Sequence, residues 1–401
     1  MIKRLNLLIL CALFSYAGFG DTLESSIIEY QKALIAGGVT GSSIAGVFRG
    51  DKIISLTSVT SDIEGDRPIS ESTLFPIWSM SKPITITAMM VLLDRNKFKL
   101  DDPVKKYIPY FENIKCKSKD SDKVYSCSND LLVEHLLSHR SGYKYYKNES
   151  GPDHRDPYLN LDEFVRHLSN QPLEFEPGSD YIYGLNQAIL GRLIEVITGR
   201  EFIEFLKEEI FDPLGMTDTK FSLTQKDRSN FQPLFRKAND IGIDRELPDQ
   251  GTSIITTDFD ELDYIVNTKK QLGGEGLISS FRDYRRFCEM LLAGGDYKGK
   301  KILSDSSFEL MTSIVTPNFL SRGFNNGLGI AYSFFVVEEP ILDGTSTPKG
   351  SFGWSGYHNT HFWIDQKNNI FGLFMTRTTP FTWEIEKHFR AVVYDSMVLN
   401  K

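Results

Sequence analysis

The chain has 401 residues, of which 41% are hydrophobic and 24% are charged, the balance of an ordinary globular protein. This length allows a large buried core and favours two lobes over one. The net charge of −8 and the isoelectric point near 5.5 argue against a nucleic-acid-binding protein, which would carry a basic patch or stripe. We therefore expect no nucleic-acid partner, and the composition leaves the oligomeric state open.

Residues 1–20 have the pattern of a secretory signal peptide. A basic start precedes the apolar run Leu5–Ala17, and small residues follow before an expected cleavage site at Asp21. The run is shorter than the roughly 20 apolar residues that a membrane-spanning helix needs. A lipid-modified Cys11 is disfavoured because bulky Leu10 precedes it. The sequence therefore predicts export to the periplasm or the medium, with no stable membrane insertion after the signal is removed.

The next part of the chain alternates between helix and strand patterns. Helical periodicity runs over Leu23–Ile35. The β-branched runs Ser43–Phe48 and Lys52–Val59 are joined by three turn residues and predict a β-hairpin. A short strand over Leu74–Trp78 then leads into a helix over Lys82–Asn96.

The middle of the chain, about Asp101–Asp260, consists mostly of helical patches and loops, with a well-defined helix over Asn186–Thr198. Cys116 and Cys127 flank a short polar hairpin or loop and could form a disulfide in an oxidising compartment. Cys288 falls in a helical pattern and is expected to be a buried thiol. These cysteines are too few for a cysteine-based zinc site.

Late in the chain the pattern returns to strands. Four apolar runs precede a closing helix over Trp383–Leu399; the runs are Gly329–Val337, Gly350–Trp354, Thr360–Asp365 and Ile370–Thr376. Strands at both ends around a helical middle predict an α+β fold, with an antiparallel sheet flanked by helices and a mainly helical lobe inserted. We assign residues 21–80 and 265–401 to the sheet lobe and residues 81–264 to the helical lobe.

The densest chemical signal is Ser79-Met80-Ser81-Lys82. Because a strand pattern changes to a helix pattern here, Ser79 and Lys82 are expected at a helix N-terminus and, three residues apart, on the same face. A serine hydroxyl is a weak nucleophile until a neighbouring base takes its proton. A neutral Lys82 could be that base, at a cost of about 4–5 kcal/mol for a free lysine at pH 7. Alternatively, a charged Lys82 stabilises a tyrosine phenolate that is the base, and the sequence does not choose between them.

A second Ser-x-x-Lys pattern occurs at Ser346-Thr347-Pro348-Lys349. It lies in a stretch rich in glycine, threonine and proline, and the proline disfavours helix at the residue before it. We interpret this copy as a chance match within a turn.

The surroundings of Ser79 resemble the serine β-lactamase-related group, which includes class C β-lactamases, D-alanyl-D-alanine carboxypeptidases and family VIII carboxylesterases. Ser-x-x-Lys is a motif of that superfamily. Further landmarks follow in chain order, at Leu100–Val104, Leu136–Gly142, Phe175–Gly178, Leu190–Glu195, Pro213–Met216 and Gly274–Leu277. The resemblance covers about residues 25–395. It implies a β-lactamase/transpeptidase-like fold and acyl transfer through an acyl-serine intermediate, with no metal and no cofactor.

The family's second catalytic element is a tyrosine in a Tyr-x-Asn motif before a helix. Its register with the helix identifies Tyr183, with Tyr181 as the rival two residues earlier. Leu185 stands where the motif has asparagine, as it does in several family VIII esterases. The resemblance implies that Tyr183 takes the proton from Ser79 and returns it to the leaving group.

The family's third element is a Lys-Thr-Gly-like strand that faces the nucleophile. The matching segment is Trp354-Ser355-Gly356, which resembles the Trp-Gly-Gly of the esterases with Ser355 in place of a glycine. The resemblance implies that these three residues bind the substrate. It also implies an oxyanion hole formed by the backbone N–H groups of Ser79 and Tyr357.

The departures from the family pattern bear on the substrate. Trp354 cannot supply the cation with which β-lactamases and carboxypeptidases bind a substrate carboxylate. His358 and Arg377 are candidates to replace that cation. Leu185 and Trp354 together favour a neutral ester.

Other motifs point to no competing chemistry. The sequence lacks the Gly-x-Ser-x-Gly elbow of α/β-hydrolases. His135 and His139 have helical spacing but not the His-Glu-x-x-His pattern, so we expect a structural hydrogen-bonding role for His139. Gly273-Gly274-Glu275-Gly276 lacks the context of a phosphate-binding loop and is expected to form a turn. Asn148-Glu149-Ser150 is a glycosylation acceptor only in a eukaryotic secretory setting.

The sequence therefore predicts a serine hydrolase that acts on a small-molecule ester or amide, with a carboxylesterase favoured over a β-lactamase or D-alanyl-D-alanine carboxypeptidase. An alternative of another class is a non-catalytic cell-wall- or ligand-binding protein on the same fold. The presence of Ser79, Lys82 and Tyr183 argues against that alternative.

Overall fold

A computed structural model describes residues 23–119, 121, 123–146, 151–237, 254–257, 260–262, 264–316 and 327–399. The predicted signal peptide and the Asn148-Glu149-Ser150 motif lie outside the described residues. Within these ranges, none of the helices combines the length and the apolar character that crossing a bilayer requires.

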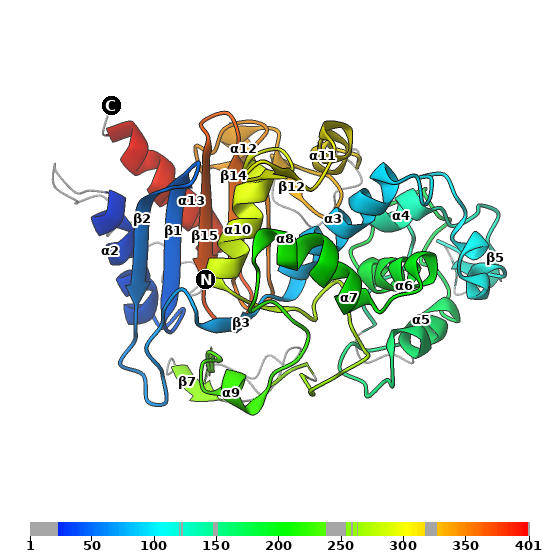
Figure 1. Cartoon of the computed structure of the whole chain (residues 1–401), viewed down its shortest axis with the longest axis horizontal. Coiled ribbons are helices and arrows are strands. Elements are labelled where there is room, and N and C mark those ends of the chain that lie inside the picture. Colours follow the sequence, from blue (N-terminus) through cyan, green and yellow to red (C-terminus); the bar gives the residue numbers. More distant parts are fainter. Residues whose placement is uncertain are drawn as a thin grey trace.

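A seven-stranded antiparallel sheet joins the two ends of the chain. Its order is β11-β12-β13-β14-β15-β1-β2, and every neighbouring pair is antiparallel. The strands are β1 (Ser43–Arg49), β2 (Lys52–Val59), β11 (Leu328–Ile330), β12 (Phe335–Val337), β13 (Phe352–Ser355), β14 (His361–Asp365) and β15 (Ile370–Met375). The predicted hairpin is confirmed as β1–β2, and the central pairing of β15 with β1 brings the late strands beside the early ones (Figure 1).

Helices cover both faces of this sheet, as alternate residues of β14 demonstrate. The ring of Phe362 lies 5.3 Å from that of Tyr284 on α10 (Phe281–Leu292). Trp363, the next residue, lies 5.1 Å from Phe389 on α13 (Trp383–Leu399). Helix α2 (Leu23–Ala36) packs beside α13. A period of two along the strand thus gives each face of the sheet its own apolar contacts.

The remaining helices of the described residues are α3 (Ser81–Asp94), α4 (Val133–Leu137), α5 (Leu161–Ser169), α6 (Asn186–Thr198), α7 (Phe202–Leu206), α8 (Asp212–Leu214), α9 (Gln225–Arg228), α11 (Asp305–Thr312) and α12 (Pro340–Asp343), with the short helices η2 (Trp78–Met80), η3 (Val104–Lys106), η4 (Pro109–Phe111) and η5 (Lys207–Phe211). Of these, α4, α5, α6 and α7 gather in a helical region beside the sheet, whereas α12 lies close to the sheet strands (Figure 1). Helix α3 is buried over almost its whole length and packs against α6 and α11. It therefore links the sheet to the helical region. Where one lobe ends and the other begins stays a prediction.

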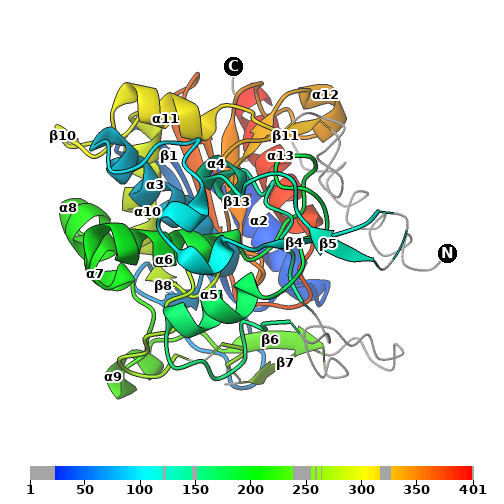
Figure 2. The ribbon, with the colours of Figure 1, turned by 90° about the vertical axis from the view of Figure 1, so that its right-hand side faces the viewer.

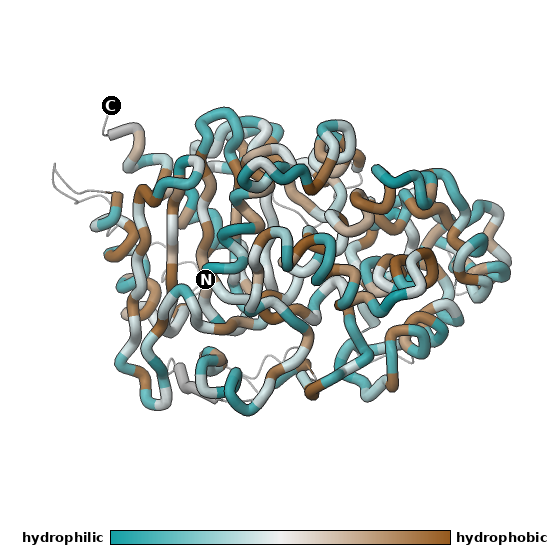
Figure 3. Tube along the Cα trace, viewed as in Figure 1, coloured by the Kyte–Doolittle hydropathy of each residue, from teal (hydrophilic) through white to brown (hydrophobic). Residues whose placement is uncertain are grey.

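Four two-stranded sheets also occur within the described residues. They are β3 (Leu74–Pro76) with β8 (Ile278–Ser280), β4 (Lys115–Lys117) with β5 (Val124–Ser126), β6 (Leu234–Lys237) with β7 (Ile254–Thr257), and β9 (Asp296–Tyr297) with β10 (Lys300–Lys301). The β4–β5 hairpin lies at the outer end of the helical region (Figure 1), the end that faces the viewer in Figure 2. Along the trace, hydrophobic residues concentrate in the inner strands and helices, whereas many peripheral loops are hydrophilic (Figure 3).

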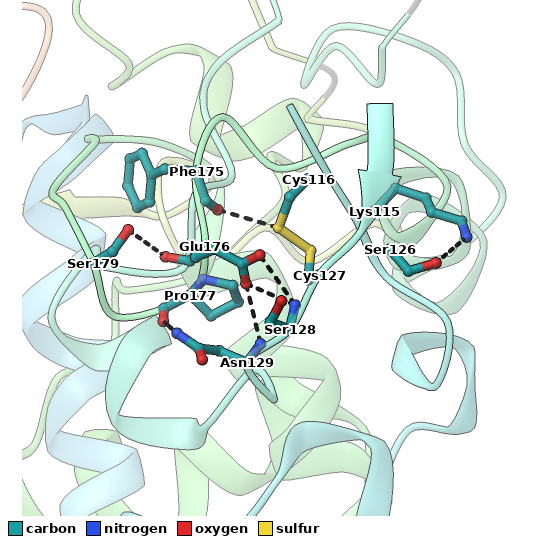
Figure 4. Close-up of a disulfide and its surroundings, with 10 residues drawn as sticks. All are labelled: Lys115, Cys116, Ser126, Cys127, Ser128, Asn129, Phe175, Glu176, Pro177 and Ser179. Atoms are coloured by element: carbon teal, nitrogen blue, oxygen red, sulfur yellow. Dashed lines mark hydrogen bonds between the residues drawn. A yellow bond between two sulfur atoms is a disulfide. The ribbon is translucent and has the colours of Figure 1, made fainter. Parts of the chain in front are cut away.

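The β4–β5 hairpin carries the pairing that the sequence left open. Cys116 and Cys127 form a disulfide (Figure 4). Beside it, the Glu176 carboxylate accepts hydrogen bonds from the backbone N–H groups of Ser128 and Asn129 at 2.9–3.1 Å. The two bonded sulfurs and Glu176 form the one group in the described residues with the spacing of metal ligands. Disulfide sulfurs are not thiolates, so this group is not a metal site.

The loop after α3 is organised around Asp102. Its carboxylate accepts hydrogen bonds from Lys106 Nζ at 2.7 Å, the Tyr107 hydroxyl at 2.6 Å and the Lys99 backbone N–H at 2.8 Å. Burial raises the pKa of Asp102, but these three hydrogen bonds outweigh it and lower the pKa to about 2. The carboxylate therefore contributes to stability only while it is ionised.

One predicted strand is divided in the structure, and one predicted buried thiol is confirmed. The run Gly329–Val337, predicted as one strand, is two strands, β11 and β12, joined by a tight turn. Ser333 in that turn has φ of 56°, and its hydroxyl accepts a hydrogen bond from Gln187 at 2.7 Å, so a contact distant in the sequence interrupts the apolar run. Cys288 is a fully buried thiol on α10, as predicted.

Candidate active site

Ser79 lies between the small β3–β8 sheet and helix α3. The 3-10 turn η2 holds it, and the α-helix itself begins two residues later, at Ser81. The helix predicted over Lys82–Asn96 therefore begins one residue earlier, and Ser79 precedes it in this short turn. The preceding residue, Trp78, has φ of 47°, a left-handed conformation that bulky side chains rarely adopt. This tight connection leaves Ser79 partly exposed while both of its neighbours are buried.

The three residues predicted to carry the chemistry meet at the Ser79 hydroxyl. Ser79 Oγ accepts hydrogen bonds from Lys82 Nζ at 3.1 Å and from the Tyr183 hydroxyl at 2.7 Å. Lys82 Nζ also lies 4.7 Å from the centre of the Tyr183 ring. Lys82 is fully buried, and Tyr183 is partly exposed just before α6. A nucleophile within reach of two proton-transfer groups is the arrangement that acyl transfer needs.

Two residues that sequence reasoning missed complete the surroundings of Lys82. Its Nζ donates hydrogen bonds to the Tyr145 hydroxyl at 3.0 Å and to the Gly274 carbonyl at 2.8 Å, in addition to Ser79. The buried Glu275 carboxylate lies 3.9 Å away. The sequence correctly predicted a turn at 273–276, but nothing in it indicated that Glu275 faces Lys82. Tyr145, three residues beyond a landmark glycine, gave no signal at all.

The tyrosines near Lys82 differ in what they contact. Burial, and after it the Glu275 carboxylate, raise the pKa of Tyr145 well above its ordinary value, so this phenol stays protonated. Only Tyr183 has a hydrogen bond to Ser79 among the described contacts. Tyr181, the rival, packs its ring 6.1 Å from that of His139. The geometry therefore favours the register that makes Tyr183 the partner of Ser79.

On strand β13, the side chain of Trp354 lies at the site, whereas the side chain of Ser355 points away from it. The Trp354 ring lies 5.8 Å from the Tyr183 ring. The Ser355 hydroxyl instead contacts Glu386 on α13 and lies 2.9 Å from His361 Nδ1. Neighbouring residues of a strand face opposite sides. The side chain of Ser355 is therefore directed away from Ser79, and substrate binding by Trp354, Ser355 and Gly356 stays a prediction.

Gly356 explains how β13 approaches the nucleophile. A Cβ atom added there would lie 2.3 Å from the Ile77 carbonyl oxygen, so only glycine allows this contact. The close approach brings Tyr357 next to η2, with its ring 5.3 Å from that of Trp78. The backbone N–H groups of Ser79 and Tyr357 as an oxyanion hole stay a prediction.

The cations considered as replacements for the missing lysine have other partners. His358 Nδ1 accepts a hydrogen bond from Trp78 Nε1 at 2.9 Å, and its Nε2 contacts Glu261. Arg377 donates to the Gln232 carbonyl at 2.8 Å and is fully buried. Both side chains are thus committed to contacts within the protein.

A cavity of about 400 Å³ shares lining residues with the apolar cluster around Trp78. It is lined by Arg155, Leu223, Arg228, Asp260, Glu261, Leu262, Tyr264 and Ile265. Three of these, Leu223, Leu262 and Tyr264, belong to the apolar cluster that contains Trp78, and Tyr357 packs against it. Its arginines face acids, since Arg155 binds Asp153 at 2.6–2.8 Å and Arg228 pairs with Asp260. The volume is within the range of small-molecule sites.

The two histidines with helical spacing have structural partners. His139 is fully buried and its Nδ1 accepts a hydrogen bond from the Asn186 side chain at 2.8 Å. Burial, followed by the charge of Lys82, lowers the pKa of His139 well below its usual value, so the ring is neutral. His135 Nδ1 accepts a hydrogen bond from the Leu132 backbone N–H at 3.2 Å. The predicted structural role of His139 is confirmed. Ser346, in the chance motif, lies in neither a helix nor a strand, and the motif reaches a turn only at Lys349.

The chain is similar to known proteins over most of its length. A family model described as Beta-lactamase matches residues 28–394. Esterase EstB of Burkholderia gladioli is 28% identical over 335 residues, covering 79% of this chain and 80% of that protein. Protein Rv1367c of Mycobacterium tuberculosis (strain ATCC 25618 / H37Rv) is 27% identical over 382 residues and 90% of each chain. The solved structure of EstCE1, a hydrolase with promiscuous acyltransferase activity, has the same fold, with a TM-score of 0.77 at 22% identity, over 93% of this chain and 98% of that one.

Proposed function

The chain belongs to the beta-lactamase family and is a serine hydrolase, and we propose that it is a carboxylesterase that cleaves small uncharged esters. Ser79 is the proposed nucleophile, and Tyr183 and Lys82 form the proton-transfer pair. The observation that carries this assignment is the pair of hydrogen bonds, at 2.7 and 3.1 Å, that these two residues donate to Ser79 Oγ.

In the proposed reaction, Ser79 Oγ attacks the ester carbonyl carbon while its proton passes to the Tyr183–Lys82 pair. The negative charge that develops on the carbonyl oxygen is stabilised by the backbone N–H groups of Ser79 and Tyr357. Collapse of the tetrahedral intermediate expels the alcohol, which takes the proton from the same pair, and leaves the acyl group on Ser79. Water then attacks the acyl carbonyl, loses a proton by the same path and releases the carboxylic acid, restoring the Ser79 hydroxyl.

The preference for a neutral substrate is supported by the charges around the site. Trp354 stands at the position where the resemblance expects a substrate-binding lysine, and its ring contacts Tyr183. His358 and Arg377 have protein partners, and the two arginines of the neighbouring cavity face Asp153 and Asp260. A substrate carboxylate could bind these side chains only by displacing their present partners, which are buried or form bidentate contacts. The relative EstB is named an esterase.

A side-by-side assay tests the ester preference. We expect kcat/KM for p-nitrophenyl acetate and butyrate to exceed that for nitrocefin by at least about 100-fold, which corresponds to about 2.7 kcal/mol of transition-state binding. A higher kcat/KM for nitrocefin or for a D-alanyl-D-alanine peptide would instead assign the chain to the β-lactamase or carboxypeptidase activities. Absence of turnover for all three substrate classes would favour a binding protein on this fold.

We also propose that the protein is exported and that residues 1–20 are removed. The Cys116–Cys127 disulfide supports this, because such bonds persist in oxidising compartments. Expression of the full chain in a bacterial host, followed by cell fractionation and N-terminal sequencing, should yield a periplasmic or secreted protein that begins at Asp21. An intact N-terminus in the cytoplasmic fraction would contradict export.

A further inference from the structure

The residue immediately before the nucleophile holds an unfavourable backbone conformation. Trp78 has φ of 47°, and a residue with a side chain adopts this left-handed conformation only at a cost in free energy. Such strain persists only where the surroundings over-determine it. The contacts of the Trp78 side chain therefore matter for where Ser79 lies.

Those contacts include a buried hydrogen-bonded chain from Trp78 to Glu261. Trp78 Nε1 donates to His358 Nδ1 at 2.9 Å, and His358 Nε2 contacts a carboxylate oxygen of Glu261. An indole N–H can only donate, so Nδ1 is unprotonated and the proton of a neutral His358 is on Nε2, directed at Glu261. All three side chains are buried, since the relative exposure is 4% for Trp78, 1% for His358 and 8% for Glu261.

The chain of contacts fixes the indole in one orientation. His358 lies 5.0 Å from it, His154 5.8 Å and Tyr357 5.3 Å between ring centres, all edge-on. Aromatic rings packed edge-on restrict rotation, and the hydrogen bond to His358 fixes which edge of the indole faces that side. Burial is the largest influence on the pKa of His358 and keeps it below the ordinary value, although the Glu261 carboxylate raises it. The lowered pKa favours the neutral ring, which the hydrogen bond from Trp78 requires.

We propose that His358 and Glu261 are positioning residues, which hold Trp78 and thereby keep Ser79 Oγ within reach of Tyr183 and Lys82. Neither of them contacts Ser79 in the described contacts, so they act through Trp78. Glu261 also lines the neighbouring cavity, which links one wall of that cavity to the placement of the nucleophile. The inference rests on Ser79 being the nucleophile of the proposed reaction, but not on the preference for esters.

The test compares two substitutions of His358 that differ in one feature. In His358→Asn the amide oxygen can occupy the place of Nδ1 and accept from Trp78, whereas His358→Leu fills the site without an acceptor. We expect His358→Leu to lower kcat for p-nitrophenyl acetate by about 30–100-fold, since a 1 Å misplacement can cost about 10²-fold, with KM within threefold of wild type. His358→Asn should recover at least one third of wild-type kcat.

A double-mutant cycle separates positioning from general loss of structure. Trp78→Phe removes the donor, so adding His358→Leu to it should lower kcat by less than about threefold further. Additive losses in the cycle, or a His358→Leu enzyme with wild-type kcat, would overturn the proposal. Glu261→Gln, which can still accept from His358, should lie between wild type and His358→Leu.

The same variants can be measured without an ester substrate. The rate at which a fluorophosphonate labels Ser79 should fall in the same order as kcat, and it stays measurable if the wild type hydrolyses none of the esters tested. A wild type that is labelled but hydrolyses none of the esters would refute the esterase proposal alone. Labelling rates equal in all variants would refute the positioning role, and a wild type that is not labelled would refute both. If His358→Leu does not fold, judged by its circular dichroism, Trp78→Phe and the Asn variant still decide the comparison.

Discussion

Replacing Tyr183 by phenylalanine removes one oxygen atom from the centre of the proposed machinery. The hydroxyl donates to Ser79 Oγ at 2.7 Å, whereas the ring contacts Lys82 at 4.7 Å and Trp354 at 5.8 Å, and these ring contacts are retained by phenylalanine. A positioned proton-transfer group contributes about 10²–10⁴-fold to the rate. We therefore expect kcat to fall by that factor, or about 2.7–5.4 kcal/mol of transition-state stabilisation.

The assay measures kcat and KM for p-nitrophenyl acetate, with Tyr181→Phe as the matched control. Tyr181 loses the same oxygen atom two residues away, in a buried position beside His139. We expect that control to keep kcat within threefold of wild type, and both variants to show cooperative thermal unfolding. A Tyr183→Phe enzyme with near wild-type kcat, combined with an inactive Tyr181→Phe enzyme, would refute the register assigned to the catalytic tyrosine.

Three further predictions concern residues around the site and the fold. Tyr145→Phe removes a hydrogen bond to Lys82 Nζ but none to Ser79 among the described contacts, so kcat should fall by about tenfold, less than in Tyr183→Phe; a larger loss would make Tyr145 the proton-transfer residue. Asp102→Asn should lower the free energy of unfolding by about 1–2 kcal/mol at pH 7. The pKa of Asp102 is lowered to about 2 in the folded protein, so the difference in unfolding free energy between wild type and Asp102→Asn should shrink as the pH falls from about 4 towards 2. Urea denaturation measures this difference, and a value that does not change with pH would contradict the prediction. Replacing Cys116 and Cys127 by serine should lower the unfolding free energy by about 3 kcal/mol, the loop-closure value for a separation of 11 residues; guanidinium curves that coincide with wild type would show that the disulfide adds nothing.

Much of the fold could be predicted because its signals are local. The hairpin β1–β2, helix α6 and the closing helix α13 each follow from periodicity over 8–17 residues. The run over 329–337 failed because apolar residues continue through the turn at Ser333. That turn is held by a hydrogen bond to Gln187, 146 positions away, which no local pattern contains.

In the candidate site, too, contacts between residues close in sequence could be predicted, and contacts between distant residues could not. Ser79 and Lys82 are three residues apart, so their proximity follows from a single turn of chain. Glu275 is 193 positions from Lys82, and Glu261 is 97 positions from His358, so their contacts depend on how distant loops pack. Ser355 is different, because the period of two along a strand already separates its side chain from that of Trp354. The resemblance implied that both residues bind the substrate, without assigning that role to their side chains.

The most direct test of the central claim is the site of acylation. Wild-type protein treated with a fluorophosphonate should gain the mass of one phosphonyl group, mapped by peptide mass spectrometry to Ser79, and Ser79→Ala should lose both this adduct and turnover of p-nitrophenyl acetate. Adduct formation retained in Ser79→Ala, together with retained turnover, would contradict the claim that Ser79 is the nucleophile.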